Sequence, residues 1–168
     1  MTVSFPMLKI RSAQPEDCYS IAGVHAAAVK GINTTLYTPE EIQAWAVPRK
    51  PESYAEAIRT KEFVVAEDGD AIVGFGVLNQ ETAEVEAVYV TPEAGRRGIG
   101  REVLRKLEEQ ASSLGLKVLR LNASLNAVPF YENVGYVAQE RSTYRLLTGV
   151  EIACIPMVKS MMREPDES

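Results

Sequence analysis

Glycines and arginines alternate in residues 91–104, "TPEAGRRGIGREVL", in a pattern that suits the binding of an anion. The residues concerned are Gly95, Arg96, Arg97, Gly98, Gly100 and Arg101. The segment follows a predicted strand and begins a long predicted helix, whose first four amides lack partners within the helix and carry partial positive charge. Glycines let a bulky anion approach the backbone, and the arginines add cations. The sequence therefore predicts an anion site, although an isolated glycine cluster is more often a solvated loop.

The glycine spacing argues against two familiar nucleotide-binding loops. The order here is G-x-x-G-x-G, whereas a dinucleotide-binding turn has G-x-G-x-x-G between its strand and its helix. A P-loop needs G-x-x-x-x-G-K-[ST], and residues 91–104 contain no lysine. A kinase of the P-loop type therefore loses its main support.

Two further segments give the glycine turn its context. Residues 85–92, "VEAVYVTP", precede it, and residues 124–136, "SLNAVPFYENVGY", come later in the chain. The three segments together resemble the GNAT superfamily of acyl-CoA N-acyltransferases. The family pattern [QR]-x-x-G-x-[GA] falls on residues 95–100, and the pattern N-x-x-x-F-Y-x-x-x-G-[FY] falls on Asn126, Phe130, Tyr131, Gly135 and Tyr136. Residues 37–46, "YTPEEIQAWA", also resemble a subgroup of small bacterial GNAT proteins.

The resemblance implies acetyl-CoA as the cosubstrate. With one histidine and two cysteines in the chain, we expect no metal. The resemblance also places the CoA pyrophosphate on the glycine turn and the pantetheine arm on the backbone of residues 88–90. The implied cofactor-binding residues are Val88, Tyr89, Val90, Gly95, Arg96, Arg97, Gly98, Ile99, Gly100, Arg101 and Asn126. Gly95 stands where the family has Gln or Arg, so the contact with pyrophosphate is expected to come from backbone amides, with Arg96 or Arg97 as the cation.

Direct transfer from a thioester to an amine needs a stabilised oxyanion and a proton for the leaving thiolate. A backbone amide near Val88 is the expected oxyanion donor, because preorganised donors are usually the largest contribution. Tyr131 is the expected general acid, since a phenol of pKa about 10 keeps its proton at neutral pH and can protonate a thiolate of pKa about 8.5. Packing beneath Phe130 is the structural alternative for Tyr131.

The amine must also lose a proton. Glu84 and Glu86 lie on one face of the predicted strand by its period of two, and Glu86 is the closer to the expected thioester. We expect Glu86 to act as general base, either directly or, as the resemblance implies, through ordered water; an exposed surface carboxylate is the equally weighted alternative. Asn126 is expected to orient the pantetheine amide or to cap the following short helix.

The resemblance implies an acceptor site walled by residues 31–46 and the last hairpin. Tyr37, Trp45 and Tyr144 are the candidate aromatic walls, since an aromatic face attracts a cationic amine, although each residue type is individually more common in a core. The acceptor is expected to be a small-molecule or peptide amine. His25, the single histidine, lies among alanines and is expected to be buried and structural.

Apolar periodicity predicts the elements that position these groups. Alternation predicts strands over residues 7–13, 62–67, 71–79, 83–90, 117–124, 136–147 and 150–158. Helical spacing predicts helices over residues 14–31, 38–46, 51–60, 98–115 and 127–135. Thr38, Pro39 and Glu41 form a predicted capping box, and Asp68-Gly69 predicts a hairpin turn.

This order indicates one α+β domain over residues 1–162, followed by a polar tail, residues 163–168, that we expect to be disordered. The resemblance implies the GNAT fold: a mixed, mostly antiparallel central sheet of about seven strands, splayed between strands 4 and 5 and flanked by helices. Pro156 is expected to leave one ladder position unpaired or to lie at a bulge. The long helix is expected to bury one face, formed by Ile99, Val103, Leu107, Ala111 and Leu114.

Composition narrows the class of protein. A chain of 168 residues that is 46% hydrophobic can form a core, and its net charge of -5 disfavours nucleic-acid binding. No apolar run approaches a membrane span of roughly 20 residues. The two cysteines are expected to be reduced, and the protein is expected to be cytoplasmic. A homodimer is compatible with the sequence. The alternative to an acetyltransferase is an acyl-CoA-binding sensor or scaffold that transfers nothing.

Overall fold

The computed structural model describes residues 8–95 and 97–162. Arg96 and the predicted tail, residues 163–168, lie outside the described residues. The first half contains β1 (Leu8–Ser12), η1 (Pro15–Asp17), α1 (Cys18–Lys30), α2 (Pro39–Trp45), α3 (Pro51–Thr60), β2 (Glu62–Asp68), β3 (Ala71–Asn79) and β4 (Glu84–Val90). The second half contains η2 (Pro92–Ala94), α4 (Ile99–Ser113), β5 (Val118–Ser124), η3 (Leu125–Ala127), α5 (Val128–Asn133), β6 (Val137–Ala138), β7 (Ser142–Arg145) and β8 (Glu151–Ser160).

The strands form one open sheet in the order β1-β2-β3-β4-β5-β8-β6, and β7 also pairs with β8. Every pairing is antiparallel except that of β4 with β5. This architecture confirms the predicted α+β class and the opening between strands 4 and 5. The described sheet has eight strands, where about seven were expected, because the stretch predicted as one strand over residues 136–147 divides into β6 and β7, which pair with successive parts of β8.

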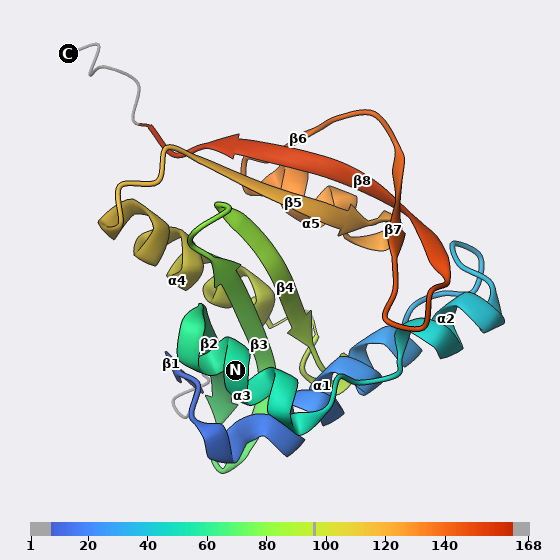
Figure 1. Ribbon diagram of the computed structural model, residues 1–168, viewed down its shortest axis with the longest axis horizontal. Coiled ribbons are helices and arrows are strands. Elements are labelled where there is room, and N and C mark those ends of the chain that lie inside the picture. Colours follow the sequence, from blue (N-terminus) through green and yellow to red (C-terminus); the bar gives the residue numbers. More distant parts are fainter. Residues whose placement is uncertain (1–7, 96, 163–168) are drawn as a thin grey trace, which may run out of the picture.

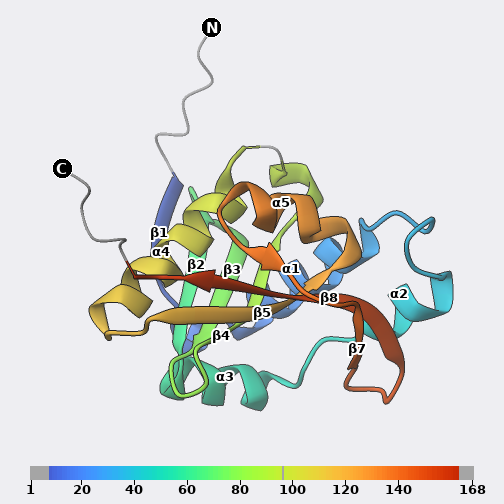
Figure 2. The same cartoon turned by 90° about the horizontal axis from the view of Figure 1, so that it is seen from above.

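Helices cover both faces of β1–β4 (Figures 1 and 2). One apolar cluster joins α4 to the sheet through residues such as Val64, Leu78 and Leu107, and a second joins α1 and α3 through Ile21, Tyr54 and Phe75. The predicted inner face of α4 is buried at Ile99, Val103, Leu107 and Ala111, but Leu114 is 51% exposed because it is the C-cap. Pro156 lies in β8 opposite Asn122, and its carbonyl accepts a hydrogen bond from the Gln139 amide (2.8 Å).

Tyr37 joins the two halves of the molecule. It is 2% exposed, and its hydroxyl donates to the Ala153 carbonyl (2.7 Å) and accepts from the Leu125 amide (2.8 Å). A third apolar cluster surrounds it and includes Trp45 and Ile152. Because a buried hydroxyl with both functions satisfied fixes its neighbours, Tyr37 holds the segment before α2 against η3 and β8.

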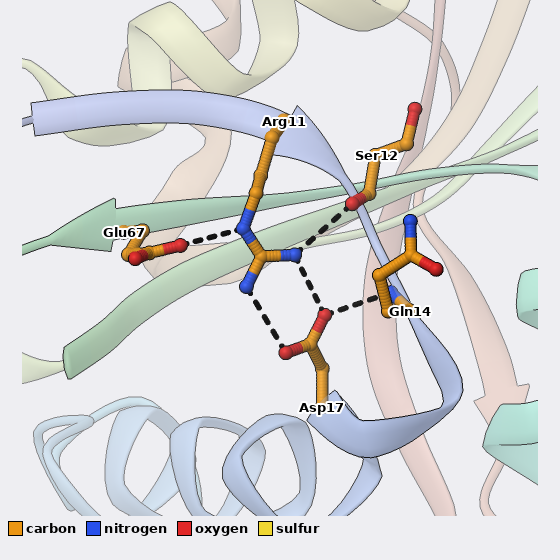
Figure 3. Close-up of polar contacts among 5 residues, drawn as sticks. All are labelled: Arg11, Ser12, Gln14, Asp17 and Glu67. Carbon is orange, nitrogen blue, oxygen red and sulfur yellow. Dashed lines mark hydrogen bonds and ion pairs between the residues drawn. The ribbon is translucent and has the colours of Figure 1, made fainter. Parts of the chain in front are cut away.

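An ion-pair network fixes the start of α1 to the sheet edge (Figure 3). The Arg11 guanidinium donates to both carboxylate oxygens of Asp17 (2.9 and 3.1 Å) and to Glu67 Oε2 (2.5 Å). The Gln14 amide also donates to Asp17 (2.7 Å). These bonds, the Arg11 bond first, lower the pKa of the buried Asp17 carboxyl below its ordinary value, although burial opposes the shift.

Asp17→Asn is expected to lower the free energy of unfolding at pH 7 by about 2 kcal/mol, because a charge-assisted network is lost. The lowered pKa of Asp17 means that its contribution is complete above the unfolded value of about 3.9 and disappears as pH falls through the folded value. Urea unfolding at several pH values between 3 and 7 measures both effects. Glu16→Gln, an exposed neighbour, is the control, and equal effects of the two substitutions would contradict the assignment.

Candidate functional site

The sheet opens where β4 and β5 separate. The two strands pair at Glu84 opposite Arg120, where the Arg120 amide donates to the Ala83 carbonyl (2.9 Å), and they then diverge (Figure 1). No further pairing joins β4 to β5 in the described part of the chain. The C-terminal half of β4 therefore has one edge without a neighbouring strand.

Backbone direction along β4 decides which groups face this gap. The Thr91 amide donates to the Val73 carbonyl of the β3 side (2.8 Å). Hydrogen-bonding groups alternate between the two sides of a strand, so Tyr89 also bonds toward β3, whereas the amides of Val88 and Val90 point into the gap. Two backbone donors thus lie where the sequence analysis expected the oxyanion donor and the pantetheine contacts.

A cavity of about 390 Å³ lies between the end of β4, the first turn of α4 and α5. Its lining includes Val90, Gly98, Gly100, Arg101, Phe130 and Asn133. Gly98 is the N-cap of α4 and has φ 78°, a conformation that favours glycine. A Cβ on Gly100 would lie 3.6 Å from both Phe130 and Val90, inside the space that these residues line. The free first-turn amides and the missing side chains fit a pyrophosphate group.

The cations near this cavity differ in their surroundings. Arg101 is exposed on the lining, whereas the Arg97 guanidinium donates to Oδ2 of Asp68 (3.1 Å), the last residue of β2. Arg96 lies outside the described residues. Gly95 also lines the cavity, and its amide donates to the Pro92 carbonyl (3.1 Å). That amide is therefore already used within the turn.

A β-bulge determines which side chains of β4 face the α1 side of the sheet, opposite α4. Val77 pairs with Ala87 but Leu78 pairs with Val85, so Glu86 is an extra residue in β4. Val85, Val88 and Val90 pack on the α4 side, whereas Ala87 and Tyr89 pack on the α1 side. Without the bulge, strict alternation would place Glu86 with Val88 and Val90. The bulge puts both Glu84 and Glu86 on the α1 side with Tyr89.

A second cavity, of about 330 Å³, occupies that α1 side. Its walls include Trp45, Phe75, Tyr89 and Tyr144 and the carboxylates Glu84 and Glu86. The two cavities lie on opposite faces of β4, with the open backbone of Val88 and Val90 between them. Asn122 and Ser124 of β5 also line the second cavity, so it reaches across the gap.

The two carboxylates on this wall have different partners. Glu86 Oε1 accepts from Lys61 Nζ (2.5 Å), and Glu86 Oε2 accepts from Asn79 Nδ2 (3.4 Å). The Glu84 carboxylate has neither a hydrogen bond nor an ion pair with any described residue. Burial first, and the charge of Glu86 second, raise the pKa of the half-buried Glu84 carboxyl above its ordinary value. The ionised form of Glu84 is thus less stabilised by its surroundings than that of Glu86.

Tyr131 lies in α5, on the α4 side of the sheet. It is 8% exposed, and its ring contacts Phe130 and Tyr136 edge-on, with ring centroids 5.0 and 5.6 Å away. Burial raises the pKa of its hydroxyl, and the neighbouring Tyr89 adds to the rise. That hydroxyl bonds to no described residue, and Tyr131 is not part of the lining of either cavity.

The predicted acceptor residues separate into two groups. Trp45 and the 42%-exposed Tyr144 line the second cavity, but Tyr37 lies behind Trp45 as a core residue and is not part of the lining. The Trp45 indole N–H donates to the Tyr89 hydroxyl (3.1 Å), and burial raises the pKa of Tyr89 to about 12. Tyr89, expected only for its backbone, is therefore also an acceptor-side wall.

His25 is half-buried on the same wall rather than enclosed in the core. Its Nε2 lies 2.7 Å from the Trp45 carbonyl, which can only accept, so Nε2 carries the proton. The ring stacks on Tyr89 at 5.0 Å. Burial, and then the charge of Arg49, lower the pKa of His25, which keeps the ring neutral at neutral pH.

Asn126 differs from its expected place. It is exposed in η3, lines neither cavity and does not cap α5, whose N-cap is Ala127. Sequence reasoning named Phe130 only within a motif and missed Asn133, Val134, Asn122 and Ser124 on the cavity walls. These residues come from elements whose mutual placement depends on the sheet. The described residues contain no group of three or more His, Cys, Asp or Glu that could hold a metal, and no helix among them is long and apolar enough to cross a membrane.

Comparisons with known proteins agree with this geometry. The model of the acetyltransferase (GNAT) domain matches residues 33–161. An uncharacterised N-acetyltransferase, YafP of Escherichia coli K12, is 29% identical over 136 residues, which cover 80% of this chain and 85% of YafP.

Solved structures of acetyltransferases are also similar to this chain. A GCN5-related N-acetyltransferase from Rhodopseudomonas palustris superposes with a TM-score of 0.86 at 28% identity, covering 95% of this chain and 98% of that one. The structure of YncA from Salmonella typhimurium with its cofactor acetyl-CoA has a TM-score of 0.70 at 18% identity, covering 96% of this chain and 99% of that one. The latter likeness shows the fold.

Proposed function

Because this chain belongs to the GNAT superfamily and is an N-acyltransferase, we propose that it transfers an acetyl group directly from acetyl-CoA to a primary amine. Acetyl-CoA supplies the thioester carbonyl, at which an N–C bond forms as the C–S bond breaks. The observation that carries the proposal is the pair of cavities on opposite faces of β4, with unpaired backbone groups between them. Two reactants can thus approach one another through the gap, which is the positioning that direct transfer requires.

The cosubstrate contacts are assigned to the α4 side. The amides of the first α4 turn, at Ile99, Gly100 and Arg101, would hold the pyrophosphate. The backbone of residues 88–90 would bond the pantetheine arm, and the Val88 amide would donate to the oxyanion. Gly95, Arg96, Arg97, Gly98 and Asn126 remain predicted contributors. Because Arg97 pairs with Asp68 while Arg101 lines the cavity, Arg101 is the better-supported cation there.

Proton transfers are assigned to one tyrosine and one glutamate. Tyr131 would protonate the leaving thiolate, since its hydroxyl holds its proton at neutral pH. Glu86 was the predicted base and lies nearer along β4 to Val88. Glu84 is favoured as base because Lys61 and Asn79 already bond Glu86. Glu84 lies four residues from Val88, about 13 Å of extended strand, so its proton would come from the amine through ordered water.

Acetyl-CoA is expected to stabilise the protein by about 2.7 kcal/mol at a concentration of 100 times Kd, and thus to raise Tm measurably. A matched pair of variants locates the site. Gly98 and Gly115 both have φ 78° and both have open space where a Cβ would lie, so alanine causes similar backbone strain at each. Gly98→Ala should reduce the ligand-induced shift, and Gly115→Ala, at the far end of α4, should keep it.

No thermal shift for the wild type at saturating acetyl-CoA would contradict the cofactor assignment. The alternative function, an acyl-CoA-binding sensor or scaffold, predicts the shift without chemistry. Release of free CoA thiol in the presence of amines separates the two: amine-dependent release supports the transferase, whereas binding without release from a broad amine panel supports the sensor.

A further inference from the structure

The charged residues around the acceptor cavity are not all paired. The lining contains Arg49, Glu56, Lys61, Glu84 and Glu86. Lys61 pairs with Glu86 (2.5 Å), and Glu56 pairs with Arg59 (2.6 Å). Within the described part of the chain, Arg49 and Glu84 form no ion pair and no side-chain hydrogen bond. Arg49 and Glu84 are therefore available to bind a charged ligand.

Arg49 stands on a restrained segment. Pro48 and Pro51 flank "RK" between α2 and α3, and proline fixes its own φ and restricts the residue before it. The Arg49 amide also donates to the Tyr54 hydroxyl (3.4 Å). The backbone of this exposed arginine is thus held in place before a ligand arrives, which lowers the entropy cost of binding.

Arg49 and Glu84 belong to different parts of the cavity. The Arg49 amide bonds the hydroxyl of Tyr54, which packs with residues of α1, and this places Arg49 at the α1–α3 wall. Glu84 stands where β4 and β5 join, opposite Arg120. Aromatic and apolar side chains, among them Phe75 and Trp45, line the same cavity. An amine with a negative group at its other end and an apolar body matches this arrangement.

We propose that the acceptor is a primary amine that carries a carboxylate, bound by Arg49 while the amine faces the gap between β4 and β5. This inference rests on the proposed transferase function and names its substrate class. A guanidinium can donate two parallel hydrogen bonds to a carboxylate, and such a contact discriminates strongly against an uncharged analogue. The net charge of -5 gives an anion no long-range attraction, so a local cation is needed.

The test compares ω-amino acids of increasing length with their carboxamides, for example 6-aminohexanoate with 6-aminohexanamide. The carboxamide removes the charge, keeps the shape, and leaves the distant amine nearly as basic. CoA thiol release is expected to give the carboxylate of at least one pair a lower KM, by about 10-fold or more, with similar kcat. Arg49→Gln should abolish this preference, Arg49→Lys should restore part of it, and Lys50→Gln, a neighbouring exposed cation outside the lining, should retain it.

Each outcome bears on the inference. Equal KM values for carboxylates and carboxamides, equal losses for both in Arg49→Gln, or release with spermidine and with no carboxylate would overturn the substrate class and leave the transferase function intact. Absence of thiol release from every amine, while acetyl-CoA still raises Tm, would overturn the transferase function and the inference that rests on it.

Discussion

Replacing Tyr131 with phenylalanine is expected to lower kcat about 100-fold or more, because positioned general acids contribute roughly that much to proton transfer. The affinity for CoA should change little, since the Tyr131 hydroxyl bonds to no described residue. The phenyl ring keeps the edge-on contacts with Phe130 and Tyr136, so the fold should be preserved. Steady-state rates of thiol release, with calorimetry for CoA, separate the two effects.

Tyr136→Phe is the matched control for Tyr131. Tyr136 belongs to the same apolar cluster, but its hydroxyl donates to Glu108 Oε2 (2.9 Å), and Glu108 also accepts from Lys159 (3.1 Å). Loss of that bond should lower the free energy of unfolding by about 1 kcal/mol and leave kcat nearly unchanged. Unaltered turnover in Tyr131→Phe would remove Tyr131 from the mechanism.

Glu84→Gln is expected to lower kcat/KM at neutral pH about 100-fold, with a smaller effect for Glu86→Gln. A base works only when ionised, so the wild-type rate should fall as pH drops through the pKa of Glu84, which lies above the ordinary value for glutamate. Glu84→Gln should lose this dependence. Profiles of kcat/KM between pH 5 and 9 measure it.

The Tm of the Glu84 and Glu86 variants provides a second, independent measurement. A carboxyl whose folded pKa is raised binds its proton more tightly in the folded state, so stability falls as pH rises from the unfolded to the folded value. Removal of that charge by Glu84→Gln should therefore maintain or increase Tm at pH 7. Glu86→Gln breaks the Lys61 pair and should not increase it. A larger loss of activity in Glu86→Gln than in Glu84→Gln would return the base to Glu86.

The sequence predicted elements whose signals are local. The capping box at Thr38 is present, with the Glu41 amide donating to the Thr38 hydroxyl (3.1 Å) and Glu41 accepting from the Thr38 amide (2.9 Å). The α4 face and the glycine turn also follow from spacing alone, because helix periodicity and N-terminal amides depend on neighbours within a few residues.

Features that depend on distant partners were not predicted. The division of residues 136–147 into β6 and β7 depends on how β8 pairs, and the role of Tyr37 depends on Ala153 and Leu125, far along the chain. His25 was expected in the core because its alanine neighbours look apolar, yet the opening of the sheet leaves it on a cavity wall. The charge on Arg49 gave no signal in the sequence, since only the fold shows which arginines lack a carboxylate.

The extra residue at Glu86 has a consequence for comparing relatives. Because it reverses the alternation of β4, residues on the N-terminal side of Glu86 and those on its C-terminal side follow opposite odd-even rules. In a relative without this extra residue, the position six residues before the end of the strand, which Glu84 occupies here, would face the α4 side, even if the glycine turn were identical. Assignments of acceptor preference from aligned sequences should therefore count positions from the bulge and not from the glycine turn.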